Sequence, residues 1–314
     1  MAKTFVSVLC TAGALSLCAP AAARAQSYES IGIRAQGVAG AFVAVADDAT
    51  ATWWNPAGLA GSQSFIDGIV EVGRGGQWGA AVGFPALGLS YYHLNISQIQ
   101  PSGSTAANGT GRQDLGAAGT GLAVSSGGFN QFGATVGQSI GDHLVVGTTV
   151  KVMNTRSDTR GDFDLGVKGT FGRFRAGLNV RNLVSGTYGT GSDAVELTRQ
   201  ARAGIAVVTA PAGGRLDSLT VSADVDLTTA PAVIGNVGHE ERHIAGGAEA
   251  WLPGRRVALR GGVWANVVTD GGSGAYGSFG VTVSPFRKCF VDGAAMWGPT
   301  ADRDRWGIDL RVTF

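Results

Sequence analysis

The chain has 314 residues, a formal net charge of +1 and only 15% charged residues. A net charge so close to zero excludes the strong positive field of a nucleic-acid-binding protein. The charged fraction lies below the roughly one quarter of soluble domains, and no run of about 20 apolar residues follows the N-terminal segment. With 51 glycines and no collagen repeat, this composition favours a β-sheet wall that buries its apolar face in lipid.

The first 25 residues have the three parts of a secretory signal peptide. Lys3 gives a positive start, an apolar run extends from Phe5 to Leu17, and Ala23–Ala25 forms a small-x-small cleavage site. We expect cleavage near Ala25, because the run is too short for the alternative, an N-terminal membrane anchor. Cleavage removes two of the three cysteines, so the mature chain keeps Cys289 alone and cannot form an internal disulfide.

Residues 26–62 are rich in small residues and do not alternate like a strand, as in "GVAGAFVAVADDATATWWNPAGLAG". Asn55 can cap a helix that has Pro56 at its first position, which predicts one short helical turn. A compact apolar segment ahead of a barrel is what a lumen plug requires, and Trp53 and Trp54 would seal it. A periplasmic cap and a disordered leader are the alternatives.

Residues 63–314 repeat a period-two alternation. In "DRWGIDLRVTF" one face holds Trp306, Ile308 and Leu310, and the other holds Asp309 and Arg311. Runs of about ten such residues between turns are typical of a transmembrane antiparallel β-barrel, so we expect about 14 strands with the N-terminal plug inside the lumen. The predicted strands are 64–73, 77–84, 86–96, 128–139, 142–153, 160–171, 173–183, 197–209, 216–227, 242–252, 255–268, 275–286, 289–297 and 304–314.

The connections alternate in length. Short periplasmic turns are expected near 140–142, 172, 211–218, 253–254 and 286–288. Outer segments, most of them longer, are expected at 98–127, 184–196, 228–241, 269–274 and 298–303, as in outer-membrane barrels. A further strand at Leu115–Ser126 would make the count odd, so we place that stretch in the first outer segment.

The polar face of each predicted strand should line the lumen, while aromatic residues near strand ends should form a girdle. Trp251, Trp297 and Trp306 are placed in that girdle. An ordinary soluble β core is the alternative, and it would leave the signal peptide and the inward charges as coincidences. The charged residues expected to line the lumen are Asp164, Lys168, Arg173, Arg175, Arg181, Asp224, Asp226, Arg260, Asp309 and Arg311.

Three patterns suggest chemistry but lack the required context. "HEERH", His239–His243, matches a zinc-protease motif, yet no helix is expected around it, so an exposed polar loop is the simpler interpretation. "GSGAYG", Gly272–Gly277, does not lead from a strand into a helix and is interpreted as a hairpin turn. Asp47 and Asp48 could bind a cation, but more simply they cap the turn before the tryptophans. We therefore expect no metal, no cofactor and no catalytic site.

The stretch "GVAGAFVAVADDATATWWNPAGLAG" resembles the N-terminal motif of the outer-membrane fatty-acid-transporter superfamily (FadL-like), and especially of its branch associated with type nine secretion (PorV-like). The similarity continues in "FDLGVKGTFGRFRAGLNVRNL" and in "ELTRQARAGIAV". The terminal "WGIDLRVTF", which ends in Phe314, is similar to the signal read by the barrel assembly machinery.

This resemblance implies a 14-stranded barrel in the outer membrane of a Gram-negative-type bacterium, with Asn55, Pro56 and Ala57 in a movable hatch. The expected function is gated diffusive transport of small hydrophobic molecules similar to long-chain fatty acids. The alternative is a non-transporting barrel that serves as partner of a protein secretion or surface-attachment system. The expected partners are outer-membrane lipid, the barrel assembly machinery and either a hydrophobic substrate or a secretion partner, but no nucleic acid.

Overall fold

The computed structural model describes residues 31–60, 67–73, 77–101, 122–154, 158–188, 195–211, 214–234, 237–268, 274–299 and 304–314. The predicted signal peptide and both ends of the predicted plug, 26–30 and 61–62, lie outside the described residues. Cleavage near Ala25 therefore stays a prediction.

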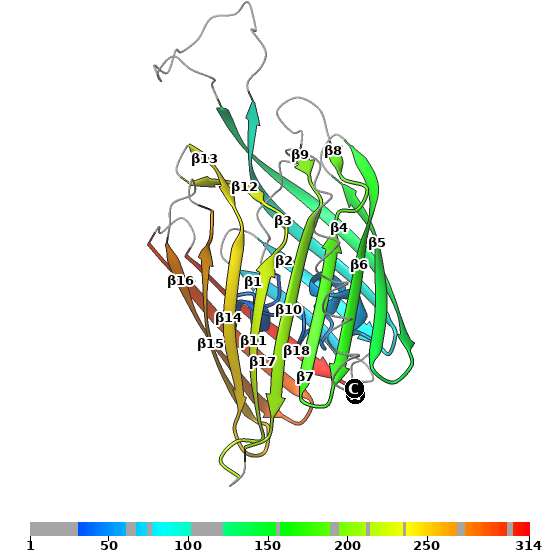
Figure 1. The fold of residues 1–314 in the computed structure, drawn as a ribbon, viewed down its shortest axis with the longest axis vertical. Helices are drawn as coiled ribbons and strands as arrows, with labels where there is room; N and C mark the ends of the chain where they lie inside the picture. The colour runs from blue at the N-terminus through cyan, green and yellow to red at the C-terminus, as the bar shows by residue number, and fades with distance from the viewer. Residues whose placement is uncertain are drawn as a thin grey trace, which may run out of the picture.

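Fourteen antiparallel strands close into one barrel, which confirms the fold class expected from the sequence. The ring closes where β18 (Arg305–Thr313) pairs with β1 (Asp67–Gly73), with Leu310 opposite Val70 (Figure 1). A closed ring leaves no free sheet edge, so the backbone N–H and C=O groups of every strand can form hydrogen bonds with a neighbouring strand. The other strands around the barrel are β2 (Trp78–Phe84), β3 (Leu87–Pro101), β4 (Leu122–Ile140), β5 (Leu144–Asn154), β6 (Thr159–Phe171), β7 (Phe174–Arg181), β10 (Gln200–Thr209), β11 (Ser218–Asp226), β14 (His243–Trp251), β15 (Val257–Asn266), β16 (Ala275–Phe286) and β17 (Cys289–Trp297).

Each of the fourteen predicted strands overlaps one barrel strand, but the first outer segment is partly wrong. β3 and β4 extend beyond their predicted ends, and Leu122–Ser126 belongs to β4, where it pairs with Ser97–Pro101. The stretch that could have been a fifteenth strand therefore lengthens an existing one, and the count stays even.

Two predicted outer segments contain strands of their own. β8 (Gly186–Tyr188) pairs with β9 (Val195–Leu197), and β12 (Ala230–Ile234) pairs with β13 (Val237–Glu241). These hairpins stand outside the barrel ring, because β7 pairs directly with β10 and β11 with β14. The predicted outer segments 184–196 and 228–241 therefore each contain a short hairpin, which the sequence analysis did not predict.

The barrel is apolar outside and polar inside. In β6 the side chains of Phe163, Leu165 and Val167 are exposed, whereas Asp162 and Asp164 are buried. Water would penalise so large an exposed apolar surface, whereas lipid stabilises it. The alternative of a soluble β core is therefore wrong, and the molecule has the architecture of a transmembrane β-barrel.

The predicted aromatic girdle is correct for two of its three tryptophans. Trp297 and Trp306 are half exposed on the outside of β17 and β18. Trp251 points inward instead, is only 5% exposed and donates its Nε1 hydrogen to Glu249 at 3.1 Å. The reason is parity, because Trp251 shares the inward face of β14 with His243 and Glu249.

At one end of the barrel, which we call the short-turn end, strands join through brief turns such as 85–86, 141–143, 172–173 and 287–288. The chain also ends here, since Val312 of β18 lies opposite Cys289, directly after the last of these turns (Figure 1). The short-turn end therefore corresponds to the turns that the sequence predicts to be periplasmic.

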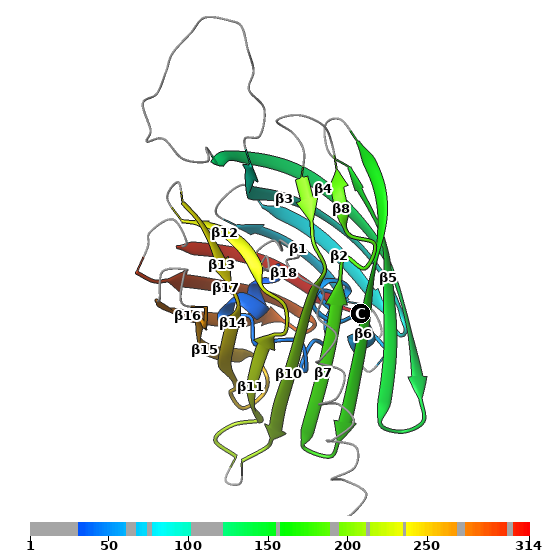
Figure 2. The same ribbon diagram turned by 45° about the horizontal axis from the view of Figure 1, so that its top comes forward.

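Residues 31–60, the plug segment, lie inside the barrel, where Figures 1 and 2 show them in blue. They form α2 (Ile33–Gly37), α3 (Ala51–Trp54) and the 3-10 turn η2 (Pro56–Gly58), and nearly all of them are buried. The predicted short helical turn with Pro56 at its first position is confirmed as η2, which ends at Gly58. No helix among the described residues is both long and apolar enough to cross a bilayer.

Candidate functional site

The Asn-Pro-Ala turn of the plug rests on a row of glycines in the wall. Gly137, Gly147 and Gly166 lie directly opposite one another across β4, β5 and β6. A Cβ atom added at Gly147 would lie 2.5 Å from the nitrogen of Ala57, and one at Gly166 would lie 2.8 Å from Cδ of Pro56. Backbone therefore touches backbone here, which only glycine permits.

The same arrangement continues around the wall. A Cβ atom at Gly177 would lie 2.6 Å from the carbonyl oxygen of Val43. Gly247 and Gly262, which are opposite each other on β14 and β15, would each bring a Cβ atom to 2.6 Å from the Val38 backbone. Inward glycines thus let the plug sit against the bare wall over much of its circumference.

Asn55 makes three hydrogen bonds, two within the plug and one to the wall. Its Nδ2 donates to the carbonyl oxygens of Val43, at 2.9 Å, and of Val167, at 3.0 Å. Its Oδ1 accepts from the backbone nitrogen of Ala57 at 3.2 Å. Because Asn55 is fully buried, loss of its two donations would leave carbonyl groups without these partners.

The two tryptophans fill the middle of the plug. Trp54 donates its Nε1 hydrogen to the carbonyl oxygen of Ile31 at 2.6 Å. Trp53 packs edge-on against Tyr92 of β3, with ring centroids 5.5 Å apart, and the Arg181 guanidinium lies 3.5 Å from the centroid of its ring. The two tryptophans therefore connect one part of the plug with another and connect the plug with two strands of the wall, β3 and β7.

Polar side chains of the wall bind the plug backbone. Asp224 accepts from the nitrogens of Phe42 at 2.8 Å and Val43 at 2.9 Å. These bonds use plug groups that no strand pairing satisfies, so they offset the cost of burying that backbone. Wall side chains also donate to plug carbonyl oxygens, and these pairs include Thr149 to Thr52, Lys168 to Ala46, Asn179 to Trp53, Arg202 to Gly40, Ser222 to Ala41 and Ser278 to Gly37.

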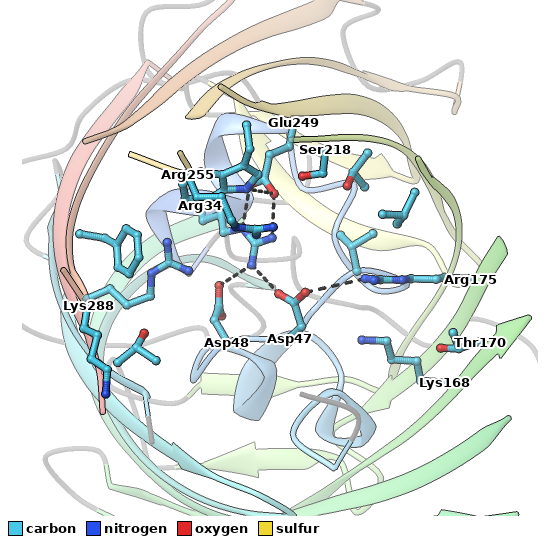
Figure 3. A pocket seen from close by; sticks show the side chains of 17 residues that line it. Arg34, Asp47, Asp48, Lys168, Thr170, Arg175, Ser218, Glu249, Arg255 and Lys288 are labelled. Carbon is cyan, nitrogen blue, oxygen red and sulfur yellow. Dashed lines mark hydrogen bonds and ion pairs between the residues drawn. The ribbon is translucent and has the colours of Figure 1, made fainter. Parts of the chain in front are cut away.

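Arg34 is the charged centre of the plug. Its guanidinium binds Glu249 of β14 through Nε at 2.8 Å and Nη2 at 2.9 Å, and it reaches Asp47 at 2.5 Å and Asp48 at 3.1 Å (Figure 3). Arg260 extends this network, bonding Glu249 at 2.6 Å. Burial alone would raise the pKa of Asp47, but the charges of Arg34 and Lys168, together with the hydrogen bond from Arg34, outweigh burial and hold this pKa below its ordinary value.

Nine of the ten charged residues expected in the lumen lie on the inward face or at the cavity described below. Arg173 does not: it is exposed in the turn between β6 and β7, because β7 begins at Phe174, one residue later than predicted. Several of the nine contact the plug, and others form ion pairs with residues of neighbouring strands. Their role is therefore more than to line a water-filled lumen. Examples of wall pairs are Lys151–Asp164 at 2.6 Å, Arg202–Asp226 at 2.5 Å and Arg260–Asp292 at 2.9 Å.

A cavity of about 560 Å³ lies between the plug and the short-turn end of the wall (Figure 3). Asp47 and Arg34 of the plug border it on one side, and Lys168, Arg175 and Trp251 of the wall border it on the other. Arg175 approaches Asp47 to 3.7 Å. The plug and this cavity together form the candidate functional site.

The "HEERH" stretch is not an exposed loop. Glu241 and His243 are buried, with the ring of His243 between Asp226 and Glu241 at 3.1 Å each. The five residues of the stretch span the end of β13 and the start of β14. Their backbone is extended and not helical, so neighbouring side chains point to opposite faces. Within the described part of the chain, no group of three or more potential ligands could hold a metal ion.

Sequence reasoning missed the most connected residue of the site. Arg34 is the sole cation between residues 26 and 62, which was a usable signal. Its partner Glu249 lies 215 residues away in the chain and stands in a plain alternating strand. Nothing local marks Glu249 as different from any other inward residue.

No family model matches this chain, and no curated protein matches it. Among solved structures it is similar to the CymD monoaromatic hydrocarbon channel and to the toluene transporter TbuX of Ralstonia pickettii. Each aligns with a TM-score of 0.60 and 11% identity over 92% of this chain and 99% of the other. The P. putida toluene transporter TodX aligns with a TM-score of 0.56 and 10% identity over 92% of this chain and 99% of that one.

At such low identity these similarities show a shared fold. This chain has the fold of outer-membrane hydrocarbon channels, which agrees with the FadL-like part of the sequence resemblance. The comparisons do not support the PorV-like branch.

Proposed function

We propose that the protein is a gated, passive transporter of small hydrophobic molecules across the outer membrane. The observation that carries this proposal is the plug segment: it fills the lumen, yet it contributes no strand to the barrel. A segment held by side-chain bonds and close packing can shift without breaking the strand ladder. The barrel fold, shared with hydrocarbon channels, supports the same function.

In this mechanism solute moves down its own gradient. An apolar molecule enters from outside, the plug segment shifts, and a path opens to the short-turn end. Trp53, Trp54, Asn55, Pro56 and Ala57 form the part of the plug that closes the lumen. We propose a substrate class of fatty-acid-like or monoaromatic molecules, the first from the sequence resemblance and the second from the names of the structural neighbours.

A disulfide between plug and wall tests the gate. A Cβ atom at Gly83 of β2 would lie 3.6 Å from Cβ of Ala49, within the roughly 3.5–4.5 Å range of disulfides. We therefore suggest Ala49→Cys with Gly83→Cys, in a Cys289→Ser background so that no other mature thiol can pair. Purified protein in liposomes should take up a labelled fatty acid only when this disulfide is reduced.

The matched control is Gly83→Cys alone in the same background, whose uptake should not respond to oxidant. If the oxidised pair, verified by mass spectrometry, transports as fast as the reduced pair, movement of the plug at Ala49 is not the gate. If the unmodified protein gives no uptake above empty liposomes with either a fatty acid or toluene, the transport proposal itself is wrong. Co-purification of a large exported protein would then favour the partner-barrel alternative.

A further inference from the structure

The cavity at the short-turn end carries an excess of positive charge. Six basic side chains border it against three acidic ones, and all three acids, Asp47, Asp48 and Glu249, bind Arg34. The acids are therefore largely engaged with one plug residue. The remaining basic groups give the open space a positive potential.

Two of these basic residues stand at the rim. Arg255 lies in the turn before β15 and Lys288 in the turn before β17, and both are exposed. Among the ion pairs formed within the described ranges, neither residue takes part in one. Figure 3 shows Arg255 and Lys288 on one side of Arg34 and Arg175 on the other, so cationic groups surround the space.

The same cavity has an aromatic wall. Trp251 and Phe290 meet edge to face, with centroids 6.0 Å apart. The guanidinium of Arg255 lies 5.2 Å from the Trp251 ring, and that of Arg311 lies 4.8 Å from the Phe290 ring. A guanidinium that stacks on an aromatic ring with its flat face still has its in-plane N–H groups available as hydrogen-bond donors. A carboxylate can accept two of these hydrogen bonds side by side.

We propose that this cavity binds an organic monoanion in which one carboxylate is joined to a flat apolar body. The carboxylate would lie between Arg255 and Lys288, and the apolar body would lie against Phe290. The volume of about 560 Å³ is within the usual range for small-molecule sites. Binding here does not depend on transport, so the site can be tested even if the gate proposal fails.

The test is fluorine NMR of 4-fluorobenzoate with the purified mature protein in a neutral detergent. Wild type should broaden and shift the signal in a saturable manner, whereas neutral 4-fluorobenzyl alcohol should bind about tenfold more weakly. The double variant Arg255→Gln with Lys288→Gln should lose about tenfold in affinity, which corresponds to about 1.4 kcal/mol.

The chain offers a matched control in the next residue of each turn. Arg256, which follows Arg255, and Arg287, which precedes Lys288, are also exposed but do not border the cavity. Arg256→Gln with Arg287→Gln removes the same net charge from the same turns and should bind like wild type. Equal loss in both double variants would show a general charge effect and overturn the site.

Two further outcomes would also overturn it. If the neutral alcohol binds as tightly as 4-fluorobenzoate, the carboxylate does not contribute to binding. Displacement of 4-fluorobenzoate by an equal concentration of inorganic sulfate would remove the role of the aromatic body. Because all four substituted positions are exposed turn residues, we expect each variant to fold, and the heat-modified gel shift of the barrel checks this.

Discussion

The plug is held to the wall in two different ways, and the contrast separates a fixed corner from a releasable one. At the turn corner, residues 55–58, backbone lies directly on Gly147 and Gly166 with no side chain between. At the arginine corner, Arg34 is held by Glu249 and two plug carboxylates beside a cavity. Close packing can give way only by moving main chain, whereas ion pairs beside water can exchange partners.

This difference suggests how a gate could work without unfolding. The turn corner would act as the hinge about which the closing part of the plug turns, and the arginine corner would move through the larger distance. The cavity already lies next to the arginine corner, so little else has to be displaced there. The following changes test whether the two corners differ as described, beginning with the largest expected effect.

Gly147→Val should have the largest effect, because its side chain would overlap the Pro56–Ala57 peptide. We expect the turn corner to detach, at a cost of at least about 3 kcal/mol of plug docking. Hydrogen exchange of residues 53–60 should rise strongly while the barrel keeps its heat-modified gel shift. Gly293→Val is the control, since nothing lies within 4 Å of its added Cβ atom; equal exchange in both variants would disprove the packing argument.

Arg34→Met should release the other corner. It leaves Glu249 and two plug carboxylates without their shared cation, at a cost of about 3 kcal/mol. Exchange of residues 31–38 should rise more than that of 53–60, and resting flux should increase. A uniform rise across both stretches would mean that the corners do not move independently.

Asn55→Asp should have an intermediate effect. The variant keeps the acceptor for Ala57 but loses both donations, and it places a carboxylate against two carbonyl oxygens. We expect a loss of about 2 kcal/mol, seen as faster exchange confined to residues 53–60. Thr148→Val serves as comparison, because it removes a hydrogen bond to the Asp164 carbonyl without touching the plug.

Asp47→Asn should have the smallest effect, below about 1 kcal/mol, because Asp47 is one third exposed and Arg34 keeps its other partners. The pKa of Asp47 is lowered in the folded protein, so its contribution is present above the unfolded value of about 3.9 and is lost as the pH falls through the lower folded value. Urea unfolding of variant and wild type should therefore differ equally at about pH 7 and pH 5. A difference that already disappears at about pH 5 would contradict the lowered pKa.

The sequence by itself determined the barrel, its strand count and the side of the wall on which most charges lie. This was possible because a strand of such a barrel contacts lipid on one face and polar groups on the other. Apolar and polar residues therefore alternate along it, and this alternation is visible in the local sequence. The same rule predicted Asp164 and Asp309 as inward. It failed for Arg173, because β7 begins only at Phe174. For Trp251 the girdle prediction used only its position near a strand end and ignored its inward parity.

Only the tertiary structure decided what the inward residues do. The glycine row consists of Gly137, Gly147 and Gly166 from three strands, and no single strand reveals that they meet under Pro56. Arg34 and Glu249 come together across 215 residues of chain, because barrel closure and the position of the plug set their distance. Contacts of this kind depend on register and on what occupies the lumen, and neither is recorded in any local pattern of residues.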